Sequence, residues 1–310
     1  MHDILLQQII NGLVLGSMYA LVALGYTMVY GIIGLINFAH GEVLMFGALT
    51  SWSVISVLQD AYPDMAPVWM LLVSILAAFV VCGTLAFTME KLAYKPLRSA
   101  PKLAPLITAI GVSLLLQTLA MIIWKPNPKP YPSMLSTEPI AIGGAVISVT
   151  QIFILGSTAV ALACLLYLVN RTKLGRAMRA TAENRAVASL MGIKPDYVIS
   201  MTFLIGAVLA ALAGVMWALN YGTVQHFMGF IPGLKAFTAA VFGGIGNLGG
   251  AVVGGLALGL IEAIGAGYLG DLTGGFLGSQ YVDILAFLVL ILVLTLRPSG
   301  LLGERTADRA

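Results

Sequence analysis

The stretch that decides the fold is Asn11–Glu42, which reads NGLVLGSMYALVALGYTMVYGIIGLINFAHGE. It lies within an apolar tract from Ile9 to Leu58. One continuous helix over that tract, about 50 residues at about 1.5 Å per residue, would be roughly 75 Å long. Because a helix crosses the bilayer core in about 20 residues, the tract predicts two membrane-spanning helices, separated by a break near Gly34–Gly41.

The rest of the chain continues this pattern of long apolar runs with short connections. Apolar residues make up 59% of the 310 and charged residues 9%, whereas a soluble domain carries about 25% charged residues. Further spans are predicted at Ala66–Thr88, Leu103–Trp124, Thr150–Leu168, Tyr197–Tyr221 and Val282–Leu296, with an interrupted tract at Phe230–Leu269. We therefore expect an all-α polytopic membrane protein, a single domain over residues 1–310 with about eight or nine transmembrane helices.

A second break is expected at GGIGNLGG (Gly243–Gly250), where two short crossings or a re-entrant hairpin meet. Both breaks carry an aromatic–Gly–x–Ile–Gly pattern, in Tyr30–Glu42 and in Phe242–Val252. Transporters are often built from inverted repeats with broken helices, so we expect an inverted repeat here. Glycines four residues apart let membrane helices approach closely, which predicts close packing at the pairs Gly12/Gly16, Gly250/Gly254 and Gly255/Gly259.

The second break also matches G-x-G-x-x-G, the dinucleotide-binding pattern, at Gly244–Gly249. That pattern needs a preceding strand and an acidic residue about 20 positions downstream. Here the match lies between two membrane-length apolar runs, and the next acidic residue, Glu262, is too close to it. We therefore reject a dinucleotide site. The sequence has no Gly-Lys pair and so no Walker A motif. It also shows no catalytic set, no metal-ligand spacing among its three His residues, and no basic stripe typical of nucleic-acid binding. We expect no enzyme activity, bound cofactor or metal, and any ATP would be hydrolysed by another subunit.

The charges are sorted by loop. Thirteen of the 16 Lys and Arg residues fall in three segments, namely Glu90–Lys102 (Lys91, Lys95, Arg98, Lys102), Asn170–Tyr197 (Arg171, Lys173, Arg176, Arg179, Arg185, Lys194) and the tail after Leu296 (Arg297, Arg305, Arg309). The intervening loops carry Asp60, Asp64, Glu138, Asp271 and Asp283. The positive-inside rule places the three basic segments, and the C-terminus, in the cytoplasm. Nine crossings would then leave the N-terminus outside. No cleavage site follows the first apolar run, so we expect it to be a retained span.

Few ionisable groups lie at membrane depth, and His40, Glu42 and Glu262 are the candidates. Such groups are costly and usually face a cavity or a partner. In one interpretation they line or gate a polar path, together with Asn37, Gly246 and Asn247 at the two breaks. In the other, Glu42 and His40 only satisfy backbone groups at the first break. A stand-alone secondary transporter or channel, with these groups relaying protons, is a competing class.

The segment GRAMRATAENRAVASLMGI (Gly175–Ile193) is predicted to be cytoplasmic. Ala180–Met191 is interpreted as one short amphipathic helix that stops at Gly192 in the C′ position. Its apolar side would be Ala186, Leu190 and Met191. A helix of this kind fits a groove on another protein, and the alternative is a helix lying on anionic lipid.

Three stretches together resemble a known family: Asn11–Glu42, Gly175–Ile193 and KAFTAAVFGGIGNLGGAVVGG (Lys235–Gly255). They are similar to the bacterial high-affinity branched-chain amino acid ABC permeases of the LivH type. RPSGLLG (Arg297–Gly303) also suits the C-terminal end of that family.

The resemblance implies a permease subunit of an ABC importer in the bacterial inner membrane, which carries leucine, isoleucine or valine. Its partners would be a homologous LivM-type permease, two ABC ATPase subunits that use ATP and Mg²⁺, a periplasmic binding protein and the lipid bilayer. The segment at 175–193 would be the coupling loop, with Ala182, Glu183, Asn184, Arg185, Leu190 and Gly192 as its contact residues. Relatives of the same build import urea or short amides, so these stay alternative substrates.

Overall fold

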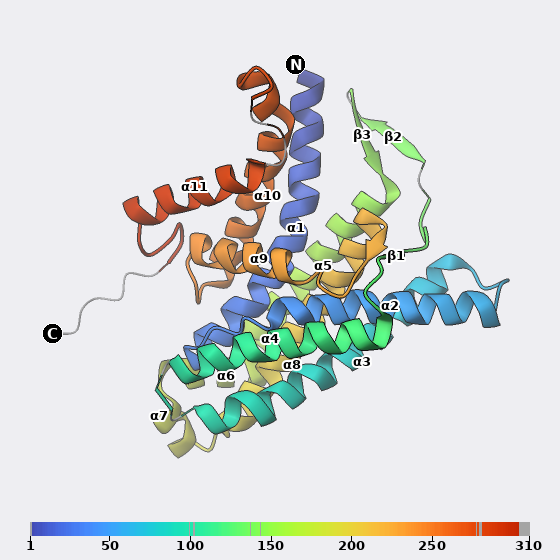
Figure 1. Cartoon of the computed structure of the whole chain (residues 1–310). Helices are drawn as coiled ribbons and strands as arrows, with labels where there is room; N and C mark the ends of the chain where they lie inside the picture. Colours follow the sequence, from blue (N-terminus) through green and yellow to red (C-terminus); the bar gives the residue numbers. More distant parts are fainter. Residues whose placement is uncertain are drawn as a thin grey trace.

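The computed structural model describes residues 2–98, 100–101, 103–136, 138–142, 144–276, 278 and 281–303. Three basic residues of the charge analysis, Lys102, Arg305 and Arg309, lie outside this described part. The long helices are α1 (His2–Ile33), α2 (His40–Ala61), α3 (Pro67–Met89), α4 (Leu103–Trp124), α5 (Val149–Arg171), α8 (Pro195–Tyr221), α9 (Phe230–Gly243), α10 (Leu248–Leu272) and α11 (Val282–Leu296) (Figure 1). Two shorter helices, α6 (Lys173–Glu183) and α7 (Arg185–Leu190), join α5 to α8.

Seven of these helices are long and apolar enough to cross a membrane, which confirms the polytopic all-α class. The other two, α9 and α11, have 14 and 15 residues. At about 1.5 Å per residue they are about 21 to 23 Å long, less than the roughly 30 Å of a bilayer core. The prediction of eight or nine crossings therefore depends on these two short helices.

The first predicted break is confirmed at residues 34–39, between α1 and α2. Gly34 has a φ of +70°, which a residue with a side chain rarely adopts, so α1 ends there. The side chain of Asn37 accepts a hydrogen bond from the backbone nitrogen of Ala39 at 3.1 Å. This local bond competes with helix formation, as Asn side chains often do.

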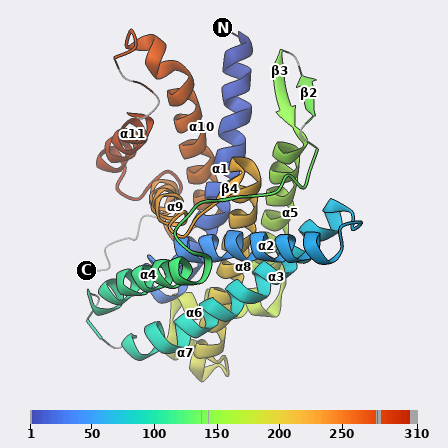
Figure 2. The same cartoon turned by 45° about the vertical axis from the view of Figure 1, so that its right-hand side comes forward.

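The packing of α1 against α10 confirms the role predicted for the spaced glycines. The two helices lie side by side in both ribbon views (Figures 1 and 2). A methyl group on Gly12 would come within 2.8 Å of the Leu260 backbone, and one on Gly16 within 2.7 Å of the Leu256 backbone. Gly259 faces Gly16 in turn. As residue numbers rise along α1, those of the contacting residues on α10 fall, so the two helices are antiparallel.

The second break, between α9 and α10, is held by the C-terminal segment. Gly244 and Gly246 have φ values of +109° and +96°. The backbone nitrogens of Leu301 and Leu302 donate to the carbonyls at the end of α9, Phe242 and Gly243, each at 2.9 Å. Those carbonyls have no partner within the helix, so the RPSGLLG segment supplies the hydrogen bonds that the end of α9 lacks at the glycine-rich break. The inverted repeat stays a prediction.

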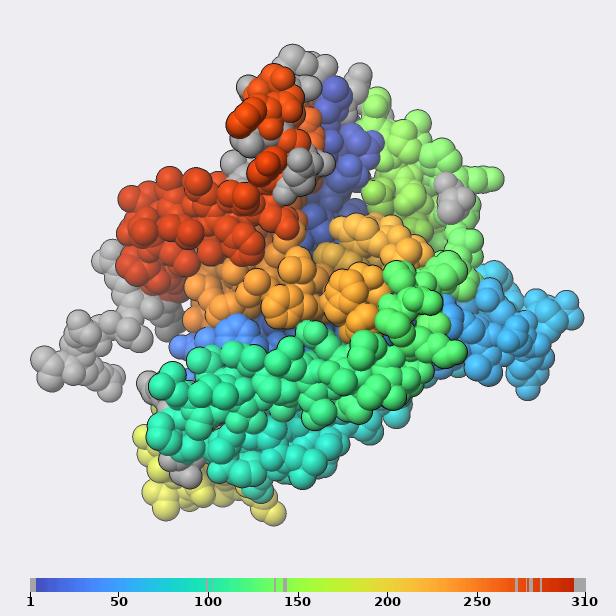
Figure 3. Space-filling view, viewed as in Figure 1, coloured from blue at the N-terminus to red at the C-terminus, as the bar shows by residue number. Residues whose placement is uncertain are grey.

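The helices α2, α3 and α8 pack together beside α1, and α4 and α5 lie at the periphery. Of the most apolar stretch of α8, 72% is buried, against 22% for α4 and 17% for α5. In Figure 3, α4 lies on the lower front face, above α3. Because these faces are apolar, lipid or another membrane protein must cover them.

The structure corrects the end of the third span. The sequence places a loop from Glu90 onward, whereas the helix continues through a π-helical turn (Glu90–Tyr94) and a 3-10 turn (Lys95–Leu97). Glu90 is fully buried and paired, so its charge does not end the helix. In the described part of the chain, two small antiparallel sheets also form, β1 (Lys129–Pro130) with β4 (Thr223–Val224) and β2 (Pro139–Ile142) with β3 (Ala145–Ser148).

Candidate functional site

Two cavities lie around Glu262 of α10. The first, the polar cavity, has a volume of about 350 Å³ and is lined by polar residues of α1, α5, α8 and α11, among them Asn11, Gln151, Asn220 and Asp283. The second, the aromatic cavity, has a volume of about 290 Å³, and its lining includes Tyr19, Trp217, Met228, Ile231 and Lys235. Glu262 and Tyr221 line both. The two cavities therefore meet at one carboxylate.

Four side chains from four helices form a charged cluster there, the Lys235 cluster. The ammonium nitrogen of Lys235 on α9 lies 3.1 Å from Oε1 of Glu262 and 2.7 Å from Oδ1 of Asp283 on α11. The hydroxyl of Tyr19 on α1 donates to Oε2 of Glu262 at 2.9 Å. Glu262 and Lys235 are 5% and 9% exposed, whereas the Asp283 side chain is 51% exposed, so the buried side of the cluster is the Lys235–Glu262 pair. It contains two carboxylates and one ammonium group.

Glu262 is thus the predicted path residue that lies on a polar cavity, and its role in transport stays a prediction. Lys235 was missed among the charged groups at membrane depth. The signal was present in the sequence, because Lys235 is the one basic residue in the apolar tract Phe230–Leu269. A basic residue in such a tract usually has a buried partner, and Glu262 lies in the same tract.

The residues predicted at the first break have protein partners instead. Oε1 of Glu42 accepts hydrogen bonds from Ser113 Oγ at 2.9 Å and from Gln117 Nε2 at 2.8 Å, both on α4. The Asn37 side chain also accepts a bond from the Tyr94 hydroxyl at 2.6 Å. Glu42 therefore bonds to side chains of α4 rather than to backbone groups of the break, and its role in transport stays a prediction.

His40 is buried beside an aromatic ring. Its imidazole meets Tyr26 edge-on, with ring centroids 4.9 Å apart, and Nε2 has no hydrogen-bond partner.

At the second break, the Asn247 side chain has partners within the protein. It accepts a hydrogen bond from Gly250 N at 3.0 Å and donates one to Leu302 O at 2.9 Å. Gly246 instead lines a cavity shared with the α6–α7 segment.

The α6–α7 segment corrects the prediction of one helix over Ala180–Met191. The helix α6 ends at Glu183, and Asn184 begins α7 as its N-cap, because its side chain accepts a hydrogen bond from Val187 N at 3.1 Å. An Asn in this position competes with helix continuation. Together α6, α7 and Gly192 form what we call the docking segment.

The predicted stop at Gly192 is confirmed. Gly192 has a φ of +83°. Its backbone nitrogen donates to Ser189 O, and that of Ile193 donates to Ala188 O, each at 3.1 Å. This pair of bonds is the Schellman motif, which favours glycine at this position. It turns the chain sharply from α7 into α8.

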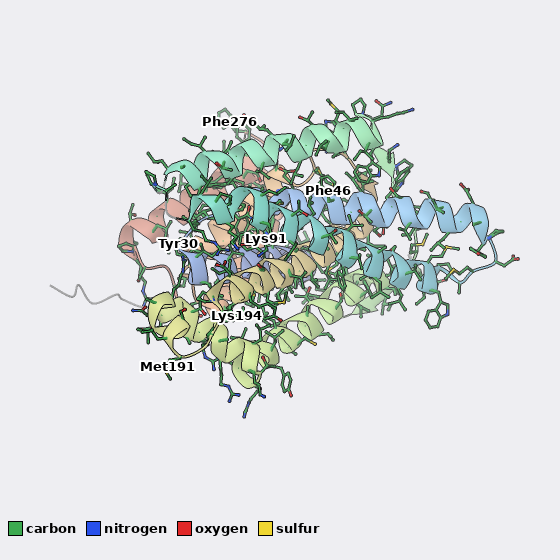
Figure 4. The ribbon with its side chains drawn as sticks, turned by 90° about the horizontal axis from the view of Figure 1, so that it is seen from below. Tyr30, Phe46, Lys91, Met191, Lys194 and Phe276 are labelled. Atoms are coloured by element: carbon green, nitrogen blue, oxygen red, sulfur yellow. The ribbon has the colours of Figure 1, made fainter. Side chains whose placement is uncertain are left out.

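The predicted apolar side of the docking segment is open to the surroundings. Leu190 is 86% exposed and Met191 78%, and Figure 4 places Met191 at the outer edge of the molecule. Ala182 and Glu183 are also exposed and line the cavity that contains Gly246. This cavity, which we call the hinge cavity, measures about 460 Å³ and is also bounded by Tyr30 at the end of α1.

Arg185 points inward rather than outward. Its Nη2 donates to the backbone carbonyls of Ile32 at 2.9 Å and Ile33 at 2.8 Å, at the last turn of α1. Those carbonyls lack partners in the helix and carry the negative end of its dipole, which a guanidinium stabilises. Burial, and then the positive charge of Arg98, lower the pKa of Arg185 from its usual value. Arg185 therefore joins the docking segment to the first break.

A second buried ionic group at this end of the molecule was not predicted. Arg98 donates to the carboxylates of Glu90 and of Asp196, in the first turn of α8. Glu90 also accepts a bond from Ser200 Oγ at 2.9 Å, and Lys95 pairs with Asp196 at 2.8 Å. From the sequence, Arg98 and Glu90 were both assigned to one loop, and Asp196 lies 98 positions from Arg98, so the group was not recognised.

Comparisons with known proteins find relatives over nearly the whole chain. Residues 8–294 match the family model described as the permease component of a branched-chain amino acid transport system. The chain is 44% identical over 308 residues to the high-affinity branched-chain amino acid transport system permease protein BraD of Pseudomonas aeruginosa, covering 98% of this chain and 97% of that protein. It is 41% identical over 310 residues to the corresponding protein LivH of Escherichia coli, again covering 98% and 97%.

A solved structure, PsaBC from Streptococcus pneumoniae in complex with Fab, matches 96% of this chain and 92% of that chain at 14% identity, with a TM-score of 0.45. The family model and the two full-length relatives cover nearly all the helices described above, including both breaks and the docking segment. The chain belongs to the family of branched-chain amino acid transport permeases.

Proposed function

We propose that this chain is the membrane-spanning subunit of an ATP-driven importer that carries leucine, isoleucine and valine across the bacterial inner membrane. Its partners would be a homologous permease subunit, two ATPase subunits and a periplasmic binding protein, with the C-terminus on the cytoplasmic side. The names of the full-length relatives support the substrate and the transport role. ATP and Mg²⁺ would bind to the ATPase subunits.

The observation that carries the proposal is the geometry of the docking segment. It exposes an apolar tip at Leu190 and Met191 and anchors Arg185 on the end of α1. An exposed apolar tip on a basic, predicted cytoplasmic face suits a groove on a partner protein. Movement of such a partner would reach the first break through two short hydrogen bonds.

The test is co-purification of the chain with the products of neighbouring genes, followed by ATPase assays in nanodiscs with leucine-loaded or urea-loaded binding protein. We expect an ATPase to co-purify and its activity to rise with the leucine-loaded protein. A rise with urea alone would keep the importer and overturn the substrate. Solute movement by the chain without any ATPase would overturn the importer itself in favour of a secondary transporter.

A further inference from the structure

The Lys235 cluster has an uneven charge balance that a ligand could complete. Lys235 lies between two carboxylates, Glu262 and Asp283, at 3.1 and 2.7 Å. The contact with Asp283 has hydrogen-bond geometry, whereas Oε1 of Glu262 is buried with no hydrogen-bond partner. Glu262 is thus close to a positive charge but lacks an aligned donor. A buried carboxylate oxygen without a donor carries a desolvation cost that a donor from a ligand would remove.

The unpartnered oxygen belongs to a side chain that lines both cavities. The polar cavity on one side is lined by Gln8, Asn11 and Gln151, and the aromatic cavity on the other by Trp217, Met228 and Ile231. The aromatic cavity, at about 290 Å³, is close to the roughly 300 Å³ at which small-molecule pockets begin. A charged centre beside a small apolar wall matches a molecule with a charged head and a short apolar side chain.

We propose that the Lys235 cluster is a binding site for the zwitterionic head of an apolar α-amino acid, with Glu262 receiving the ammonium group, Lys235 receiving the carboxylate, and the side chain lying in the aromatic cavity. The site extends the proposed function and rests on it, because it names the chemical class that the permease admits. The bound head completes an alternating row of charges, Glu262, ammonium, carboxylate, Lys235 and Asp283. Tyr19 keeps Glu262 in place through its hydroxyl.

This arrangement selects for molecules that carry both charges. Separating Lys235 from Glu262 leaves the buried Glu262 carboxylate without a counter-ion and leaves Lys235 with only the half-exposed Asp283. Breaking a buried pair is strongly unfavourable unless the charges gain new partners. A zwitterion supplies both partners at once. An amine supplies only one, a carboxylate only the other, and urea or a short amide neither. The cluster therefore binds amino acids in preference to neutral amides, because a neutral amide would leave charged groups of the cluster unpaired.

The experiment measures protection of an introduced thiol in the intact complex in nanodiscs, without ATP or binding protein. Ala266→Cys places the thiol on the wall of the polar cavity, in a Cys164→Ser background where Cys82 is fully buried. The rate of maleimide labelling is recorded against increasing leucine, leucinamide, 4-methylpentanoate and urea. Ala182→Cys, on the distant hinge cavity, is the matched control.

We expect leucine to slow labelling at position 266 and not at position 182. Leucinamide and 4-methylpentanoate should need about 10- to 100-fold higher concentration for half protection, the loss expected for one charge-assisted hydrogen bond. Urea should not protect. Lys235→Gln and Glu262→Gln should abolish protection by leucine, and Lys235→Arg should retain it. If a single variant fails to fold, the double variant Lys235→Gln/Glu262→Gln takes its place. It removes both charges of the pair, so neither remains buried without the other.

Equal protection by leucinamide and leucine would overturn the proposal in favour of a cation site. An absence of protection by leucine, in a complex that imports leucine, would overturn the site and leave the proposed function intact. Protection by leucine in a complex that does not import it would support the site and overturn the proposed function. Each failure is therefore separable from the other.

Discussion

Arg185 of α7 donates a hydrogen bond from Nη2 to the backbone carbonyl of Ile33, 2.8 Å away across 152 positions of sequence. The same nitrogen reaches Ile32 at 2.9 Å. Ile33 is the last residue of α1, directly before the first break. The contact links the end of α1 to the docking segment, and Arg185, Ile32 and Ile33 all line the hinge cavity. The proposal that Arg185 transmits movement of a partner to the first break rests on this contact.

We predict that Arg185→Ala uncouples transport from ATP hydrolysis. Loss of hydrogen bonds from a charged group costs about 1.5 to 3 kcal/mol, so uptake of leucine should fall about 10-fold or more. The ATPase should still co-purify, because Arg185 points away from the exposed tip. The measurement is leucine uptake and ATPase rate side by side in proteoliposomes. Arg185→Lys keeps the charge and should recover part of the uptake. Equal losses of uptake and of co-purified ATPase would place Arg185 in the docking interface instead.

Leu190 should behave in the opposite way. It is 86% exposed, so Leu190→Ser removes little packing within the chain and the thermal unfolding midpoint should barely change. If the docking segment binds a partner through its apolar tip, recovery of the ATPase in a pull-down should drop sharply. Leu114→Ser, at an exposed position of similar type in α4, is the matched control. Full recovery of the ATPase with Leu190→Ser would contradict a docking role for the tip.

The spaced glycines predict a change of sign between two Gly→Ala variants. At Gly16, the added methyl group would lie 2.7 Å from the Leu256 backbone, and backbone cannot yield as a side chain can. Overpacking costs about 1 to 3 kcal/mol, so Gly16→Ala should lower the unfolding midpoint. At Gly111 in α4 nothing lies within 4 Å. There, Gly→Ala should raise stability by about 0.5 to 1 kcal/mol. Thermal unfolding in detergent measures the midpoint of each variant. Equal midpoints for Gly16→Ala and Gly111→Ala would show that α1 and α10 pack less tightly than they do in the structure.

Most of the fold follows from sequence because membrane helices are local features. The span Leu103–Trp124 and the last span Val282–Leu296 have the predicted bounds. Both breaks follow from glycines that stop a helix within a few residues. Asn184 shows the limit of this reasoning, because an amphipathic pattern continues across it while its side chain caps a new helix.

The sites were harder to predict because their contacts join distant parts of the chain. Lys235 and Asp283 are 48 positions apart, and only the packing of α9 against α11 shows that they pair. Arg185 was predicted as a docking residue, yet its contact with Ile33 depends on how α7 folds back on α1. Hydropathy shows which charged residues are costly to bury, and the tertiary structure shows which partners stabilise each of them.

The buried group around Glu90 gives the last prediction. Arg98 donates to Glu90 and to Asp196, so it joins the end of α3 to the start of α8. Glu90 is fully buried, and removing one partner of a buried pair costs about 3 to 5 kcal/mol. Arg98→Met should therefore lower the unfolding midpoint strongly, measured in detergent by thermal denaturation.

Two further variants separate the charge from the shape of this group. Glu90→Gln combined with Arg98→Met leaves no unpaired buried charge, so much of the stability should return. Lys95→Met removes a partner of Asp196 that is 45% exposed, and an exposed pair contributes only about 0 to 1 kcal/mol. If the double variant is as unstable as Arg98→Met, the loss comes from packing of the guanidinium rather than from a stranded carboxylate. If Lys95→Met is equally unstable, the ionic group acts as one unit, with Asp196 as its centre rather than Glu90.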